Sequence, residues 1–108
     1  MSDINVLTRL FDTISSRKGG DPEASYTAKL FHKGRTAIAQ KVGEEAVEVN
    51  IAALAQGPEE LASESADLIY HLLVLWADAD ISPDQVWTEL QKREGMSGIE
   101  EKRARGEL

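Results

Sequence analysis

Cysteine is absent from this chain of 108 residues, which excludes disulfide bonds and thiolate-ligated metal sites. Long apolar runs are missing as well. The most apolar stretch, 68–77, is interrupted by His71 and is far shorter than the roughly 20 residues that cross a bilayer. The first residues, Met1-Ser2-Asp3, lack the basic start and the apolar segment of a secretory signal. We therefore expect a soluble, cytoplasmic protein with no membrane contact.

Basic residues are absent from the middle of the chain. The net charge is −7, and all twelve lysines and arginines lie in 1–41 or 92–108. Segment 42–91 therefore holds eleven aspartates and glutamates with no local counter-charge. Because nucleic-acid-binding surfaces are basic, this balance argues against a nucleic-acid partner.

The length suits one domain over 1–108 with a single hydrophobic core. Apolar residues recur at helical spacing between capping residues and glycines, and no segment alternates like a strand. This pattern predicts helices over about 3–18, 25–33, 35–56, 58–78 and 82–94. We expect an all-α bundle of four or five helices, followed by a charged, glycine-containing tail (95–108) that is flexible or that orders on binding.

Two pairs of acidic residues interrupt the apolar stripes of the two long central helices. Glu45 and Glu48 fall among the apolar positions of the first helix, and Glu64 and Asp67 fall among those of the second. Gly57 and Pro58 form a tight turn between these helices and make them antiparallel. The two pairs are therefore expected to face each other across the bundle.

Four carboxylates in one small volume need a cation, because burying an unpaired carboxylate costs several kcal/mol. The candidates are Lys41, a basic residue from elsewhere in the fold, or a metal ion. An all-oxygen ligand set suits Mg²⁺ or Mn²⁺, which also bind phosphate oxygens and activate water, and this points to phosphate hydrolysis. The alternative is that these acids are solvated surface residues that favour the first turns of helices.

The acidic motif resembles that of the all-α nucleoside triphosphate pyrophosphatases, the MazG-like superfamily. Its pattern, E-E-x-x-E and then E-x-x-D, is matched by Glu44, Glu45, Glu48, Glu64 and Asp67. Within that superfamily the chain is most similar to the phosphoribosyl-ATP pyrophosphatase family, in stretches 25–30, 40–48, 64–75 and 97–102. The resemblance implies a cytoplasmic homodimer that converts phosphoribosyl-ATP to phosphoribosyl-AMP and pyrophosphate in histidine biosynthesis.

The site residues follow from the motif and from the charge of such a substrate. We expect the metal ligands to be Glu45, Glu48, Glu64 and Asp67. The catalytic group is expected to be Glu44, Glu45, Glu48 and Lys41, with one carboxylate positioning the attacking water and Lys41 either contacting phosphate or simply pairing with Glu45. The substrate phosphates are expected to meet basic residues among Lys29, Lys33, Arg35, Lys41, Arg93 and Lys102.

Other residues and functions stay open at this point. His71 is more typical of a hydrogen-bonded core residue than of an adenine contact, and Trp76 and Trp87 are typical of a core or a dimer interface. One alternative function is a house-cleaning pyrophosphatase of the same superfamily that acts on other nucleotides. A second is a non-enzymatic helical module whose acidic seam binds a basic partner.

Overall fold

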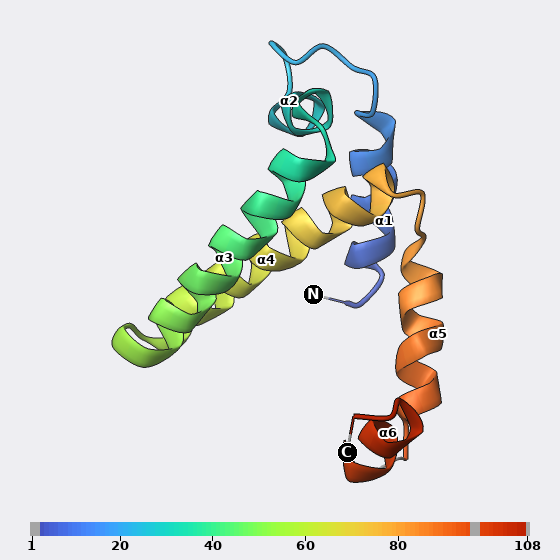
Figure 1. The fold of residues 1–108 in the computed structure, drawn as a ribbon. Coiled ribbons are helices and arrows are strands. Elements are labelled where there is room, and N and C mark those ends of the chain that lie inside the picture. Colours follow the sequence, from blue (N-terminus) through green and yellow to red (C-terminus); the bar gives the residue numbers. More distant parts are fainter. Residues whose placement is uncertain (1–2, 96–97, 108) are drawn as a thin grey trace.

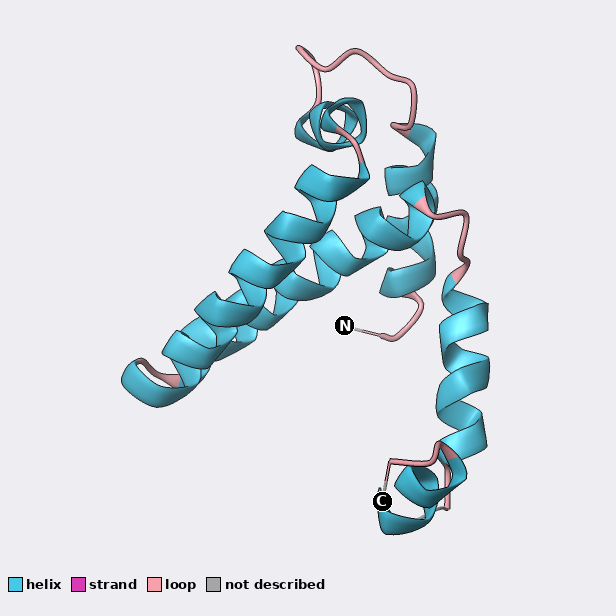
Figure 2. Ribbon diagram, in the orientation of Figure 1, coloured by secondary structure: helices cyan, strands magenta, loops and turns pink. Residues whose placement is uncertain are grey.

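The computed structural model describes residues 3–95 and 98–107, and every regular element in these residues is a helix (Figure 1, Figure 2). The predicted all-α fold is thus confirmed. No helix in the described part of the chain is both long and apolar enough to span a bilayer.

Two long antiparallel helices, α3 (Arg35–Ala55) and α4 (Pro58–Asp78), form a hairpin around which the other helices are arranged (Figure 1). Their connection is as short as predicted. The Gly57 N–H donates to Glu60 Oε2 at 3.2 Å, and Pro58 takes the first helical position, where no backbone N–H is needed. The sequence around this turn therefore fixes the antiparallel pairing.

The core lies at one end of the hairpin, where α1 (Val6–Ser16) and α2 (Tyr26–Lys33) pack against it. All four helices contribute buried apolar side chains, namely Ile14, Leu30, Ile38, Leu73, Val74 and Ala77. Burial of each larger side chain contributes about 1.5–3 kcal/mol. The opposite end, at the α3–α4 turn, extends beyond α1 and α2 (Figure 1).

A break at Gly34 separates α2 from α3. Its φ of 98° lies in the region that only glycine adopts readily, and its N–H bonds back to the carbonyls of Leu30 and Phe31. At the other end of α2, the Ser25 hydroxyl accepts from the Ala28 N–H at 3.1 Å, as expected of a capping serine. The two signals give α2 the predicted bounds.

Two further helices, α5 (Pro83–Arg93) and α6 (Gly98–Ala104), extend away from the α1–α4 body (Figure 1). Trp87 of α5 meets Trp76 of α4 edge to face, with ring centroids 6.1 Å apart. The expectation of four or five helices was wrong, because the described residues form six. The sixth lies in the segment expected to be a tail, where glutamate, lysine, arginine and alanine favour helix despite the flanking glycines.

The predicted helix ends were displaced by up to three residues. Helix α1 spans Val6–Ser16 instead of 3–18. Asn5 precedes its first residue without a side-chain capping bond, and Arg17 follows its last residue. Helices α3 and α5 each end one residue earlier than expected.

Candidate active site

Three carboxylates from α3 and α4 converge in the middle of the hairpin. Oxygen atoms of Glu45, Glu64 and Asp67 lie within 4.8 Å of one another. Only 13% of the Glu45 side chain is exposed. Carboxylate oxygens at this spacing are the donor set that hard divalent cations take, so these residues fit Mg²⁺ or Mn²⁺.

Mutual repulsion in this group is evident at Glu64. Burial raises the pKa of its carboxyl, and the nearby charges of Asp67, Glu48 and Glu45, in that order, raise it further. Each of these effects disfavours the ionised form of Glu64. A bound divalent cation would remove the repulsion, because it offers opposite charge to all of these oxygens at once.

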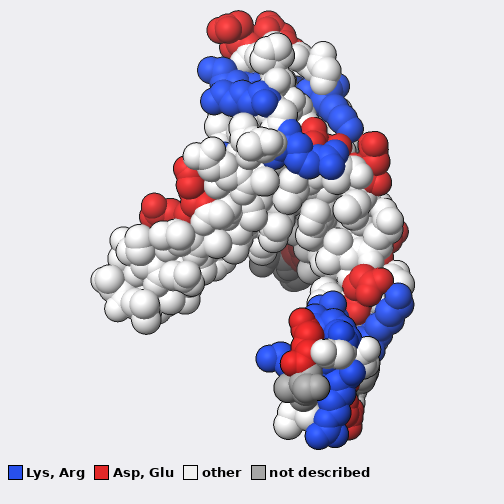
Figure 3. All heavy atoms as spheres, viewed as in Figure 1, with Lys and Arg blue, Asp and Glu red and all other residues white. Residues whose placement is uncertain are grey.

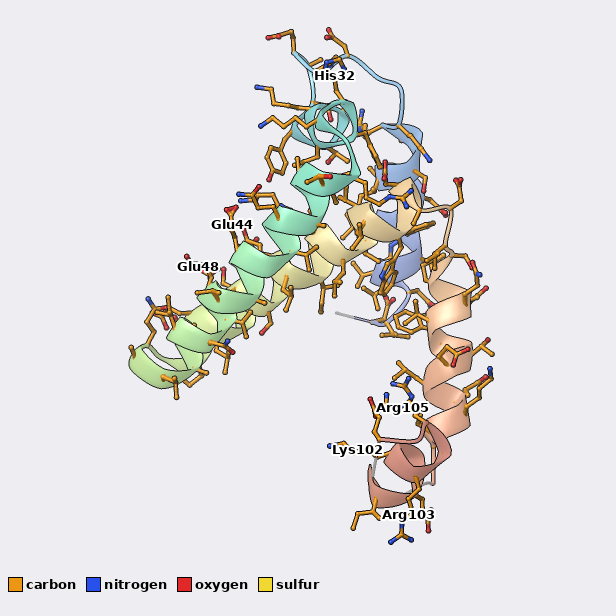
Figure 4. All side chains as sticks on the ribbon, viewed as in Figure 1. His32, Glu44, Glu48, Lys102, Arg103 and Arg105 are labelled. Atoms are coloured by element: carbon orange, nitrogen blue, oxygen red, sulfur yellow. The ribbon has the colours of Figure 1, made fainter. Side chains whose placement is uncertain are left out.

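Glu44 and Glu48 lie on the side of α3 that faces solvent (Figure 4), and both side chains are exposed. Glu48 is outside the converging group, although its charge acts on Glu64. The structure thus brings together three of the four predicted metal ligands. The role of Glu48 as a ligand and the role of Glu44 in orienting water stay predictions.

Lys41 contacts this group directly. Its Nζ lies 3.2 Å from Glu45 Oε1, one helical turn along α3. The hydrogen bond to Glu45 raises the pKa of the Lys41 ammonium. Lys41 therefore places a positive charge on one of the three carboxylates.

A cleft of about 300 Å³ opens next to Lys41 in the corner between α2 and α3. Residues at successive turns of both helices line it: Tyr26, Leu30, Lys33, Ala37, Gln40, Lys41 and Glu44. The cleft thus offers two ammonium groups, an amide and an aromatic ring beside the carboxylates. Such a mixture suits a phosphorylated ligand that also carries a ring.

A chain of hydrogen bonds connects the cleft wall to α4. His71 is buried, and its Nδ1 lies 2.7 Å from the Asp67 carbonyl oxygen. Because a carbonyl only accepts, Nδ1 carries the proton, and in the neutral imidazole Nε2 is then the acceptor. The Tyr26 hydroxyl, 2.9 Å from Nε2, therefore donates its hydrogen to His71. This confirms His71 as a hydrogen-bonded core residue.

Neighbouring residues form a second link of the same kind, since the Thr27 hydroxyl and the Tyr70 hydroxyl share a short hydrogen bond. Consecutive residues of α2 thus bind consecutive residues of α4. Sequence reasoning missed both links, because partners that are 45 and 43 positions apart leave no local pattern. The one available signal was the pair of polar residues at the start of α2.

The remaining basic residues lie away from the carboxylates. Arg35 Nε binds Asp78 Oδ2 at 2.8 Å and ties the start of α3 to the end of α4, about 15 Å along the helix from the carboxylates. Lys29 is exposed and does not line the cleft. Arg93 and Lys102 belong to α5 and α6, where basic side chains gather on the projecting arm (Figure 3, Figure 4). Their roles as phosphate ligands stay predictions.

Comparison with known proteins places these observations in one family. The family model described as phosphoribosyl-ATP pyrophosphohydrolase matches residues 7–94, a range that includes the carboxylates and the cleft. The phosphoribosyl-ATP pyrophosphatase of Azospirillum brasilense is 63% identical over 93% of this chain and 90% of its own length. The protein of that name from Paramagnetospirillum magneticum is 59% identical over 95% of this chain and 94% of its own.

Proposed function

We propose that this chain, which belongs to the phosphoribosyl-ATP pyrophosphohydrolase family, hydrolyses phosphoribosyl-ATP to phosphoribosyl-AMP and pyrophosphate, a step of histidine biosynthesis. The observation that carries the proposal is the convergence of Glu45, Glu64 and Asp67 beside a cleft with two lysines. A divalent cation and an anionic substrate would meet at that point. A cytoplasmic location goes with this proposal.

The proposed metal ligands are Glu45, Glu64 and Asp67, with Glu48 completing the set from the next turn of α3. Mg²⁺ is the expected ion, and Mn²⁺ is a chemically similar substitute. When bound, such an ion neutralises phosphate charge and makes a water molecule more acidic. The donor set supports this assignment, since no histidine or cysteine belongs to the group among the residues that the structure describes.

The roles of the surrounding side chains follow from their charge and position. Lys33 and Lys41 point positive charge into the cleft and would hold phosphate oxygens. Glu44, at the cleft and next to the carboxylate group, would accept a proton from the attacking water. Water then cleaves the bond between the α- and β-phosphates, and pyrophosphate leaves.

We further propose a homodimer, which the apolar residues of α3 support. Val47, Ile51 and Leu54, spaced at one helical face, are 54%, 44% and 89% exposed. The opposite face of the same helix is buried through Ile38 and Ala52. Figure 3 shows an uncharged surface over this end of the hairpin. A helix that is apolar on two faces is normally covered on both, and a second copy would cover the exposed face.

In such a dimer the basic arm of one subunit can approach the site of the other. Figure 4 shows Lys102, Arg103 and Arg105 far from Glu44 and Glu48 of the same chain. Arg93 and Lys102 would therefore bind substrate across the subunit interface.

The test is pyrophosphate release from phosphoribosyl-ATP and from a panel of canonical and deoxynucleoside triphosphates, with Mg²⁺. We expect preferred turnover of phosphoribosyl-ATP and its loss in Glu48→Gln, while Glu59→Gln, an exposed acid in the first turn of α4, retains full activity. Preference for a deoxynucleotide would favour a house-cleaning pyrophosphatase instead. The family assignment gives no support to the alternative of a non-enzymatic module that binds basic partners.

A further inference from the structure

The contact between Lys41 and Glu45 puts an ammonium group where a metal ligand is expected. Glu45 is one of the three carboxylates whose oxygens lie within 4.8 Å, and Lys41 Nζ already binds its Oε1 at 3.2 Å. An oxygen that accepts from an ammonium group is less available to a divalent cation. Lys41 therefore neutralises part of the negative charge of the three carboxylates in the metal-free protein. In doing so it occupies Glu45 Oε1, an oxygen that the cation would bind.

A second acceptor for this ammonium group exists in the same cleft. The Tyr26 hydroxyl gives its only hydrogen to His71 Nε2, at 2.9 Å, so its oxygen presents lone pairs and no proton to the cleft. Tyr26 and Lys41 both line this cleft. Burial raises the pKa of the Tyr26 hydroxyl, and the positive charge of Lys41 acts in the opposite direction.

We propose that Lys41 and the divalent cation compete for Glu45, and that Lys41 moves to the Tyr26 oxygen when the cation binds. The inference rests on the metal site proposed above. Its consequence is an order of events: the Lys41 ammonium group is released from Glu45, and so can bind substrate phosphate, only after the cation is in place. Metal binding would then give substrate phosphate two positive groups, the cation and the released Lys41 ammonium group.

Tyr26 is a positioning residue in this scheme, because it acts on the substrate only through Lys41. The direction of its hydrogen bond excludes the more obvious role as a phosphate donor. A hydroxyl whose hydrogen is held by a buried histidine can receive an ammonium group but cannot donate to a phosphate oxygen.

The test measures metal affinity in the absence of substrate, by calorimetric titration of Mn²⁺ or Mg²⁺ into the full-length, metal-free protein. Four proteins form a double-mutant cycle: wild type, Lys41→Met, Tyr26→Phe and the double variant. Lys33→Met is the control, since Lys33 lines the same cleft, whereas the ion pair with Glu45 is formed by Lys41. Thermal unfolding verifies that each variant is folded.

We expect Lys41→Met to bind the metal about fivefold more tightly, the effect of removing one competing ion pair, and to exceed any change in Lys33→Met. Tyr26→Phe should bind about two- to fivefold more weakly in the wild-type background and without effect in the Lys41→Met background. The inference is overturned if Lys41→Met binds no more tightly than Lys33→Met. It is also overturned if Tyr26→Phe weakens binding equally in both backgrounds, because Tyr26 would then act only through His71 and Asp67. Absence of metal binding by the wild type would instead refute the proposed metal site itself.

Discussion

Replacing Leu54 with serine tests the proposed dimer most directly. Leu54 is 89% exposed, so nearly its whole side chain is available to a partner. Burial of a leucine contributes about 1.5–3 kcal/mol, and a symmetric dimer buries it twice. Leu54→Ser should therefore weaken the dimer by about 3–6 kcal/mol, or about 10²- to 10⁴-fold in its dissociation constant.

Sedimentation equilibrium over a range of protein concentrations measures this constant. Ala53→Ser is the matched control, because Ala53 is exposed on the same helix but lies about 100° around its axis from Leu54, outside the apolar face, and so tests the effect of serine on α3 itself. We expect the control to associate like the wild type. The reasoning fails if Leu54→Ser dissociates at the same concentration as the wild type, and the dimer proposal fails as a whole if the wild type is monomeric.

Three further measurements test the core, the carboxylates and the polar link. Leu73→Ala should lower the free energy of unfolding by about 2–5 kcal/mol in urea denaturation, because Leu73 is fully buried and the cavity forms in the core; no loss would contradict the packing described. The raised pKa of Glu64 means that the folded protein favours the protonated form of this carboxyl. Protonation of Glu64 therefore stabilises the folded protein, fully below about pH 4.5, and this stabilisation is lost as the pH rises through the pKa of the folded state. The melting temperature of the metal-free protein should therefore fall over that pH window relative to that of Glu64→Gln. The same pH dependence in both proteins would refute the effect. Nitrogen NMR of His71 should show a protonated Nδ1 and a bare Nε2, whereas the opposite tautomer would reverse the hydrogen bond to Tyr26.

The helices and the carboxylate group were predictable because their signals are local. Gly57 and Pro58 lie next to each other and define the α3–α4 turn, and Ser25 caps the helix that follows it directly. The facing positions of Glu45 and Glu64 follow from helical periodicity once that turn is known. Each of these inferences needs only the regular geometry of a helix and one short connection.

The rest of the site depends on contacts between distant residues. The link of Tyr26 to His71 requires the angle between α2 and α4, which no spacing in the sequence contains. The same holds for Arg35, predicted to bind phosphate but found on Asp78, 43 positions away. Glu48 shows a different limit: periodicity places its backbone near the group, but helical spacing does not tell that its side chain stays exposed.

The break at Gly34 has a geometric consequence for the ligand. From this corner, Tyr26 lies eight residues away along α2 and Lys41 seven residues away along α3, about 12 Å and 10 Å of helix. The cleft therefore lies in a corner with arms of nearly equal length, with Lys33 and Ala37 close to the corner and Tyr26 and Lys41 at the outer end. The outer end is the one next to the carboxylates, so the phosphates that meet the cation would lie there beside Lys41, and Lys33 would hold a more distant phosphate group nearer the corner.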